Sequence, residues 1–308
     1  MSQTLILGGA GFIGSNLTRA LVARGERPRV LTRPSPAVGN LRDLLGQVDL
    51  VYGDFMDEMV MRSALTGIDT VYHLVTTTFP NMVRESSVYD LLSNLLPTIR
   101  LLQLSLELKV KRIVYASSGG TIYGEPLQMP ISEEHPLVPK SAYGQSKLTI
   151  ENYLAFYGRT TELEVSILRL SNPYGPRQNP LGVQGVIAVA MGCAMDGRPM
   201  TLFGRGEAVR DYIYIDDIIE AMLLAATHPP AVLNVSSGIG RSVAEVTDEV
   251  ERVSGRRIER VYAPPRPGDV SANVLDNRRA QALLNWRPQI DFVEGVGRSW
   301  HWLSHLRQ

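Results

Sequence analysis

Two short runs of residues have the types and spacing to do chemistry, Gly8-Gly9-Ala10-Gly11-Phe12-Ile13-Gly14 near the start of the chain and Tyr143-Gly144-Gln145-Ser146-Lys147 near its middle. Tyr143 and Lys147 are four residues apart, a spacing that puts two side chains on one face of a helix. A lysine ammonium there lies near a phenol and favours the phenolate. Because an ordinary tyrosine has a pKa of about 10, a phenolate at neutral pH needs roughly 4 kcal/mol of differential stabilisation. The pair predicts a site of proton transfer.

The glycine run predicts a binding site for a dinucleotide. Gly8, Gly11 and Gly14 are three residues apart, between a short apolar run and a stretch with helical spacing. Such glycines allow a tight turn, let the backbone approach a pyrophosphate and let the helix pack on the strand. The helix N-terminus adds amide donors and a partial positive charge. Phe12 and Ile13, at the start of that helix, belong to the same predicted site.

The residues after the next two strands bear on which dinucleotide is bound. An acidic residue about 20 positions further on usually meets the ribose hydroxyl of NAD. Here the second strand ends at Thr32 and Arg33, and Arg33 could instead face the extra phosphate of NADP. NAD and NADP are both open at this point. Asp54, with Phe55 beside it, follows the third strand and is a candidate partner for the adenine amino group.

The elements that must position these groups alternate between strands and helices. Apolar runs predict strands at Thr4–Leu7, Arg29–Thr32, Asp49–Tyr52, Thr70–Leu74 and Arg112–Ala116, and helical spacing predicts helices at Ser15–Arg24, Met56–Leu65, Tyr89–Leu108 and Tyr143–Tyr157. This alternation indicates an α/β fold with a doubly wound parallel sheet of the Rossmann type, which binds ligands at the carboxyl ends of its strands. The pair Ser117-Ser118 ends the last of these strands, and this position favours an active site at Tyr143 over an ordinary helix pair.

Beyond about residue 172 the pattern loosens, and prolines and glycines crowd the turns. We expect a smaller α/β substrate-binding domain there. A strand at Tyr212–Ile215 and an apolar helix to Ala226 return the chain to the first domain. The predicted division is 1–172 plus about 207–232 for the dinucleotide-binding domain, and 173–206 plus 233–308 for the second.

Composition excludes several classes of protein. The 308 residues carry 31 basic and 31 acidic side chains, so no net charge is available to attract nucleic acid or an anionic membrane. No run of roughly 18 apolar residues predicts a membrane span. The single cysteine, Cys193, fits a reducing compartment, so we expect the cytoplasm. No cluster of metal ligands is expected.

The segment 91–102 is apolar on more than one face of a helix, which a single contact with a sheet cannot bury. It either packs deeply within one chain or meets a second copy. We favour a homodimer in which this helix and the helix Tyr143–Tyr157 form a four-helix bundle with their symmetry mates.

The chain resembles the extended short-chain dehydrogenases/reductases, and among them the NAD-dependent sugar-nucleotide epimerases of the UDP-galactose 4-epimerase type. The likeness runs nearly from end to end. The residues that carry it are Gly8 to Gly14, Gly53-Asp54, Tyr72-His73-Leu74, Asn94 with Thr98, Ser117 to Gly124, Tyr143 with Lys147, Asn172 to Arg177, Arg210 to Ile213, Asp216-Asp217, Arg266 to Asp269 and Trp286-Arg287-Pro288.

What the resemblance implies is a cycle without net oxidation. Tyr143 takes the proton from the hydroxyl at carbon 4 of a nucleotide sugar while hydride leaves that carbon for NAD, and hydride then returns to the other face of the 4-keto sugar. Lys147 holds the nicotinamide ribose and lowers the pKa of Tyr143. A Ser or Thr that helps to bridge the substrate in the family is replaced here by Gly119, so its work falls to Ser118, Thr121 or water. Leu74, Val75, Asn94 and Ser117 are implied as further cofactor contacts.

The same stretch discriminates between related reactions. The related 4,6-dehydratases carry an Asp-Glu pair where this chain has Gly120 and Thr121, and the related UDP-glucuronate decarboxylases carry Glu at the position of Thr121. The sequence therefore favours 4-epimerisation over dehydration and over decarboxylation. The alternatives that stay open are an NADP(H)-dependent nucleotide-sugar reductase or dehydrogenase, a UDP-glucuronate decarboxylase and a non-catalytic dinucleotide sensor.

The resemblance also implies contacts to a UDP-sugar substrate. The substrate-binding residues that it implies are Asn172, Arg177, Leu202, Arg210, Arg266, Asp269 and Asn273. Guanidinium groups suit the oxygens of a diphosphate. Asn273 replaces a bulky tyrosine of galactose-specific enzymes and leaves room for an N-acetyl group. The sugar stays open between UDP-Glc/Gal, UDP-GlcNAc/GalNAc and a UDP-uronate.

Overall fold

The structure is a computed structural model that describes residues 3–34, 36–79, 87–182, 184–265 and 269–306. Its centre is a parallel seven-stranded sheet in the order β10-β6-β5-β4-β1-β2-β3. These strands are β1 (Thr4–Leu7), β2 (Arg29–Thr32), β3 (Asp49–Tyr52), β4 (Thr70–His73), β5 (Arg112–Ser118), β6 (Glu164–Leu170) and β10 (Val232–Val235). The predicted doubly wound α/β fold is confirmed.

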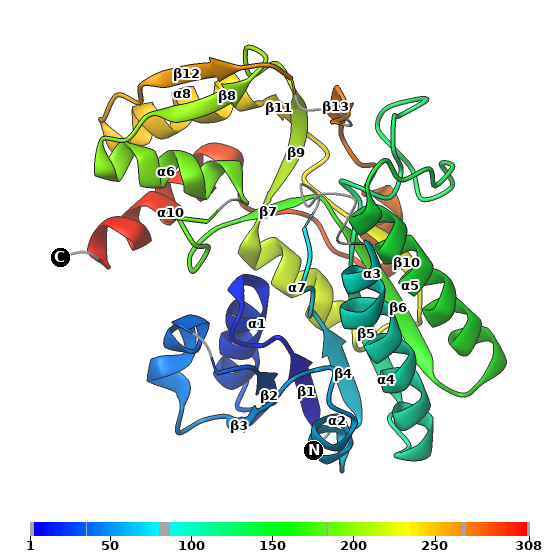
Figure 1. Ribbon diagram of the computed structural model, residues 1–308. Coiled ribbons are helices and arrows are strands. Elements are labelled where there is room, and N and C mark those ends of the chain that lie inside the picture. The colour runs from blue at the N-terminus through cyan, green and yellow to red at the C-terminus, as the bar shows by residue number, and fades with distance from the viewer. Residues whose placement is uncertain (1–2, 35, 80–86, 183, 266–268, 307–308) are drawn as a thin grey trace.

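Helices cover both faces of this sheet, because successive residues of a strand point to opposite faces. Ile6 packs with α1 (Phe12–Ala23) and α7 (Ile215–Ala225). Its neighbours Leu5 and Leu7 pack with the helices of the other face, which are α2 (Glu58–Leu65), α4 (Leu96–Glu107) and α5 (Ala142–Thr160). Figure 1 shows the two groups of helices on either side of the strands.

Local signals in the sequence explain where several elements begin. The Asp57 carboxylate caps α2 by accepting from the amides of Met59 and Val60, and Ser141 caps α5 by accepting from the amide of Gly144. The helix predicted at Tyr89–Leu108 consists of α3 (Ser87–Asp90), a π-helical turn at Leu91–Leu95 and α4. Such π turns often mark functional sites.

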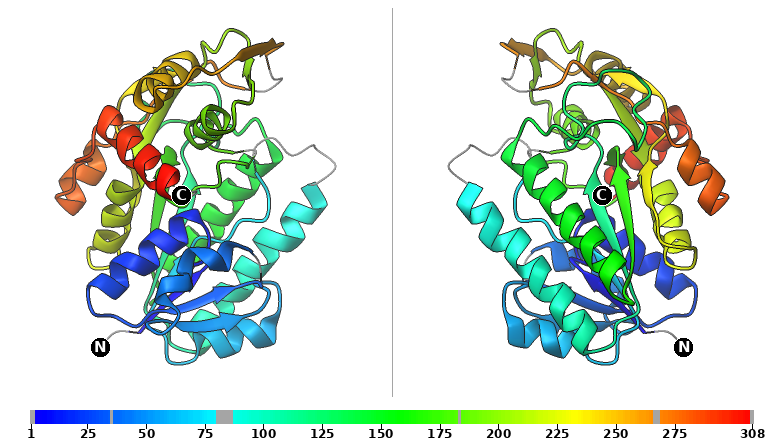
Figure 2. Two further views of the ribbon diagram at one scale, coloured as in Figure 1. Left: turned by 90° about the vertical axis from the view of Figure 1, so that its left-hand side faces the viewer. Right: turned by 90° about the vertical axis from the view of Figure 1, so that its right-hand side faces the viewer.

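A second layer lies over the carboxyl ends of the strands (Figure 2). It contains a sheet of β7 (Asn172–Tyr174), β9 (Val209–Tyr214), β11 (Gly240–Ser242) and β13 (Ala272–Asn273), and a parallel pair of β8 (Met200–Phe203) and β12 (Arg260–Ala263). Further elements are the 3₁₀ segment η1 (Pro36–Leu44) beside α1, and α6 (Val186–Asp196), α8 (Val243–Ser254), α9 (Arg278–Leu284) and α10 (Phe292–His305).

The chain passes between the layers more than once. β9 belongs to the smaller sheet, although it lies in the predicted return to the first domain, whereas β10 extends the large sheet and spans the predicted boundary at residue 232. The division into two domains stays a prediction. Within the part of the chain that the structure describes, no helix has the length and apolar character needed to cross a membrane.

Candidate functional site

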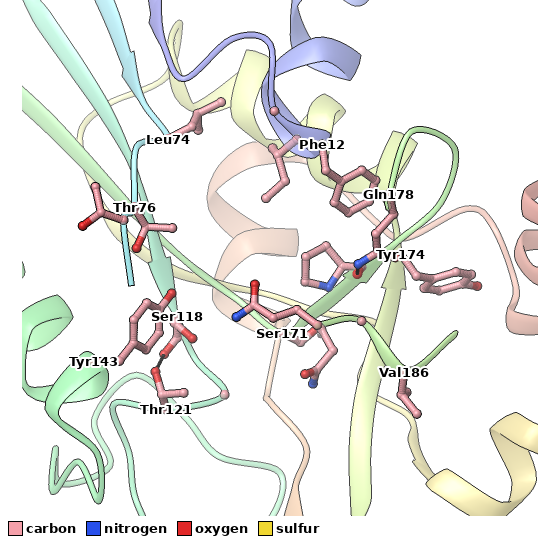
Figure 3. A pocket seen from close by; sticks show the side chains of 18 of the residues that line it. Phe12, Leu74, Thr76, Ser118, Thr121, Tyr143, Ser171, Tyr174, Gln178 and Val186 are labelled. Atoms are coloured by element: carbon pink, nitrogen blue, oxygen red, sulfur yellow. Dashed lines mark hydrogen bonds between the residues drawn. The ribbon is translucent and has the colours of Figure 1, made fainter. Parts of the chain in front are cut away.

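A cavity of about 1740 Å³ lies between the carboxyl ends of the large sheet and the second layer. Among its walls are many of the residues that the sequence singles out. Those residues are Gly8, Gly11, Phe12, Ile13, Gly14, Thr32, Arg33, Asp54, Phe55, Leu74, Val75, Ser118, Thr121, Tyr143, Asn172, Arg210 and Asp269. The glycine run and Tyr143, which are far apart in the sequence, therefore face one space, as Figure 3 shows for Phe12 and Tyr143.

The glycine turn has the geometry that a pyrophosphate requires. Gly8 has a φ of 82°, in the left-handed region, and its carbonyl accepts from the amide of Gly11 at 3.0 Å. A Cβ at Gly14 would lie 2.3 Å from the carbonyl oxygen of Gly8. No side chain caps the N-terminus of α1, which starts at the cavity wall. The turn therefore fits a dinucleotide, whose phosphates would meet the helix N-terminus.

Three hydroxyl groups gather at the other end of the cavity. Figure 3 shows Ser118, Thr121 and Tyr143 side by side, and the Thr121 hydroxyl donates to the Ser118 carbonyl at 3.4 Å. Burial raises the pKa of Tyr143 to about 12, and side-chain hydrogen bonding from Ser118 and Thr76 opposes that rise. A group that favours the phenolate is therefore needed for proton transfer near neutral pH.

Lys147 supplies positive charge next to Tyr143. Its Nζ lies 5.8 Å from the centre of the Tyr143 ring and donates to the Ala116 carbonyl at 3.0 Å. The ammonium is buried behind the cavity wall, and this burial lowers the pKa of Lys147 to about 8, while the carboxylates of Asp90 and Glu151 raise it. An ammonium this close to a phenol favours the phenolate in general, and this role of Lys147 toward Tyr143 stays a prediction.

Several other predicted site residues lie outside the cavity wall, in contacts that explain their burial. The Asn94 Oδ1 accepts from the Thr77 amide at 3.0 Å, and the Ser117 hydroxyl donates to the Glu151 carboxylate. Asn94 thus holds a cavity-lining segment in place, whereas Ser117 joins a buried ion pair of Glu151 with Arg169. Their predicted contacts to the cofactor stay predictions.

The predicted substrate residues also divide into some that line the cavity and others that lie in contacts away from its wall. Leu202 belongs to β8, is 1% exposed and packs in the core. Arg177 has a φ of 73° and donates from Nη1 to the Asn16 Oδ1 at 3.0 Å, which fastens its loop to α1. Asn273 is buried and donates from Nδ2 to the Gly119 carbonyl at 3.2 Å. Arg266 lies outside the described residues.

The structure gives a physical reason for glycine at position 119. A Cβ built there would lie 2.4 Å from the Leu275 Cδ1, whereas a Cβ at Gly120 would meet nothing within 4 Å. The side chain of Leu275 thus occupies the space that a side chain at position 119 would need. Ser118 and Thr121 are the predicted hydroxyls that do line the cavity.

Sequence reasoning missed several polar residues of the cavity wall. These are Thr76, Thr77, Ser171, Gln178 and Gln184. The threonines follow β4 directly, so the strand-end rule used for Ser118 could have found them. Gln178 and Gln184 lie in loops of the second layer without a motif that marks them.

The fold and the site together define an extended short-chain dehydrogenase/reductase, with a dinucleotide turn and a Tyr-x-x-x-Lys pair at one cavity. The chain belongs to the NAD-dependent epimerase/dehydratase family, whose sequence model matches residues 4–236. The family uses NAD, and this resolves the choice between NAD and NADP that Arg33 left open.

Individual relatives agree with this assignment. The chain is 34% identical to a putative UDP-glucose 4-epimerase of Methanocaldococcus jannaschii, over 98% of both chains. It is similar in structure to the UDP-glucose 4-epimerase of Thermotoga maritima solved with UDP-glucose, with a TM-score of 0.94 and 33% identity over 99% of this chain and all of that one. The Thermus thermophilus UDP-glucose 4-epimerase in complex with NAD gives a TM-score of 0.91 and 35% identity, over 98% and 99%.

Proposed function

We propose that this protein is an NAD-dependent epimerase that inverts carbon 4 of a UDP-hexose through a transient 4-keto sugar. The observation that carries the proposal is the placement of the glycine turn and the Tyr143 phenol on the walls of one cavity, with Lys147 directly behind the phenol. The names of the relatives support the same reaction.

In this proposal the chain's own residues move one proton. Tyr143, as phenolate, accepts the proton of the 4-hydroxyl and later returns it, and Lys147 stabilises the charged form. Ser118 and Thr121 hold the sugar oxygen in reach of the phenol. NAD held at the glycine turn would supply the hydride acceptor and donor for carbon 4. Asn172, Arg210 and Asp269 bind the nucleotide half, together with Arg266.

The distribution of carboxylates favours epimerisation over elimination. Among the described residues that line the cavity, only Asp54 and Asp269 carry a carboxylate. Asp54 follows β3, four strands from β5, and Asp269 belongs to the second layer. Loss of water across carbons 5 and 6 needs an acid and a base near the sugar, and Gly120 and Thr121 supply neither.

Incubation with a panel of UDP-sugars, followed by NMR of the anomeric proton, tests this proposal. We expect conversion between 4-epimers of UDP-Glc/Gal, UDP-GlcNAc/GalNAc or a UDP-uronate, with no net change of nicotinamide absorbance at steady state. Stoichiometric consumption of NADP(H) would instead support a reductase or dehydrogenase, and release of CO₂ from UDP-glucuronate a decarboxylase. Binding without turnover would support a dinucleotide sensor.

The sugar pocket bears on the choice within this panel. Asn273 sits behind Gly119 rather than on the cavity wall, so the space for an N-acetyl group depends on how far Asn273 and Leu275 fill that corner. We propose N-acetylhexosamines among the substrates. Rejection of UDP-GlcNAc together with acceptance of UDP-Glc would contradict this.

We also propose a homodimer built from α4 and α5, in the cytoplasm. Large apolar side chains are exposed on these helices and on the turn before α4. They include Leu92 at 50%, Leu96 at 51%, Tyr153 at 39% and Phe156 at 50% exposure. A four-helix bundle with a second copy would bury them.

Sedimentation analysis tests the dimer. Wild type is expected at the mass of a dimer, and the double variant Leu96→Glu/Phe156→Glu at the mass of a monomer. Leu127→Glu, at an apolar side chain that is 80% exposed elsewhere, is the matched control and should stay dimeric. A wild-type monomer would contradict the proposal.

A further inference from the structure

Three consecutive threonines, Thr76 to Thr78, follow the end of β4 beside the catalytic end of the cavity. β4 and β5 are parallel neighbours with His73 opposite Tyr115, and the same register continued by three residues brings Thr76 level with Ser118. Figure 3 shows the Thr76 side chain on the same side of the cavity as Ser118 and Tyr143, with the Tyr143 hydroxyl directed toward it.

Buried polar contacts fix this threonine segment. The Thr77 amide donates to the Asn94 Oδ1 at 3.0 Å, and the Thr77 and Ser93 hydroxyls are 2.6 Å apart. The Asn94 Nδ2 donates to the Thr77 hydroxyl at 2.8 Å, and the Thr78 hydroxyl donates to the Asp90 carboxylate. All these partners belong to α3 and the π turn that follows it. These contacts hold Thr77 and Thr78 in place, while Thr76 itself is exposed on the cavity wall and its hydroxyl donates to the Thr78 carbonyl.

The Thr76 hydroxyl has one hydrogen and two acceptor positions. It donates to the Thr78 carbonyl at 3.0 Å, so its lone pairs can receive the hydrogen of a neutral Tyr143 phenol. When Tyr143 is a phenolate, rotation about the C–O bond of Thr76 turns the same hydrogen toward the phenolate oxygen. No covalent bond of Thr76 forms or breaks in either state.

We propose that Thr76 is a positioning residue for Tyr143. Its hydroxyl accepts a hydrogen bond from the neutral phenol and donates a hydrogen bond to the phenolate. In this role Thr76 and Ser118 together supply the hydrogen bonding that Gly119, which has no hydroxyl, cannot supply. The hydrogen bonding of both residues opposes the effect of burial on the Tyr143 pKa, in agreement with the geometry. The consequence for turnover rests on the proposed function, whereas the hydrogen bond itself does not.

The test uses NAD-bound protein with tyrosine labelled at the ring carbon that bears oxygen, so that NMR reports the ionised fraction of Tyr143. Tyr143→Phe identifies the signal. Thr76→Val keeps the shape of the side chain and removes the hydroxyl. Its ionised fraction should be lower at every pH at which the protein stays folded, equivalent to an upward shift of about one pH unit. Thr76→Ser should restore the wild-type curve.

Two controls separate this role from a structural one. Thr160→Val changes the same residue type on the exposed end of α5 and should leave the curve unchanged. Thr77→Val loosens the same segment without facing the phenol, so it should weaken NAD retention but not move the Tyr143 curve. Equal ionised fractions in wild type and Thr76→Val would overturn the proposal.

Turnover provides the second measurement. The limb of the pH profile of kcat that reports the ionisation of Tyr143 should move up by about one pH unit in Thr76→Val and return in Thr76→Ser. Loss of kcat with an unmoved limb would count against the proposal. If no UDP-sugar is epimerised, the proposed function fails, and the NMR titration still decides whether Thr76 binds Tyr143.

Discussion

The two halves of the cavity are built by different means. In the dinucleotide half, the backbone of β1 and α1 makes the site. Glycine is favoured at Gly8 by its positive φ, and at Gly14 because a Cβ would strike the Gly8 carbonyl. In the sugar half, side chains from β5, α5 and the second layer make the site, and residues far apart in sequence meet, as Asn273 meets Gly119. The first half is specified locally, whereas the second depends on the whole fold.

The largest expected effect lies in the sugar half, where a single atom carries the chemistry. Tyr143→Phe removes the phenolic oxygen and should lower kcat about 10³-fold, since positioned acid-base groups contribute on this order. NAD should stay bound, because the glycine turn is untouched. Rates from the NMR assay and the NAD content of the purified variant check this. Turnover close to wild type would break the proposed mechanism.

A substitution in the dinucleotide half should instead weaken NAD binding and lower the stability of the fold. Gly14→Ala places a Cβ 2.3 Å from a backbone oxygen that cannot move away, so we expect loss of bound NAD and a free energy of unfolding lower by about 3 kcal/mol. Gly39→Ala, where a Cβ would meet nothing within 4 Å, is the matched control. Denaturant unfolding and NAD content are the measurements. Retention of both in Gly14→Ala would contradict the close approach of turn and helix.

Position 119 tests whether the sugar half depends on distant contacts, because the space for a side chain there is filled by Leu275. Gly119→Ser should cost about 2 kcal/mol of unfolding free energy through its clash with Leu275. Adding Leu275→Ala should return part of that loss, whereas Gly120→Ser has open space and should cost little. A Gly119→Ser variant as stable as wild type would show that Leu275 yields freely.

The smallest effect concerns charge behind the proposed catalytic pair, Tyr143 and Lys147. The Asp90 carboxylate raises the pKa values of both Tyr143 and Lys147, so Asp90→Asn should lower both. The proposed active form needs an ionised Tyr143 and a protonated Lys147, so lowering both pKa values should move both limbs of the pH profile down, by about half a pH unit. This direction is opposite to that expected for Thr76→Val. The kcat profile of each variant is the measurement.

Sequence alone predicts the strands and the glycine turn of the dinucleotide half. The bounds of β1, β2 and β3 equal the predicted ones, and Gly8, Gly11, Gly14, Arg33 and Asp54 line the cavity. These predictions rest on local patterns, in which hydrophobic period and glycine spacing decide the structure. Tyr143 and Ser118 were found for the same reason, since each lies at a recognisable helix start or strand end.

The rest depends on contacts between distant segments, which no local pattern encodes. Arg177 bonds to Asn16 and Leu202 packs in the core, contacts that no local pattern indicates, and their predicted roles toward the substrate stay predictions. Leu275 fills the corner at Gly119 from more than 150 positions away. The π turn at Leu91–Leu95 was expected as plain helix, because a single inserted residue leaves the apolar spacing nearly unchanged.

The repeated passage of the chain between its two layers restricts how new specificities can arise. β10 completes the edge of the large sheet only after the chain has already built α6, β8 and β9 in the other layer. A sugar-binding module therefore cannot be cut out and exchanged as one continuous cassette. Engineering or evolution of this enzyme toward another carbohydrate must proceed by changing single residues in place, while the interwoven scaffold is kept.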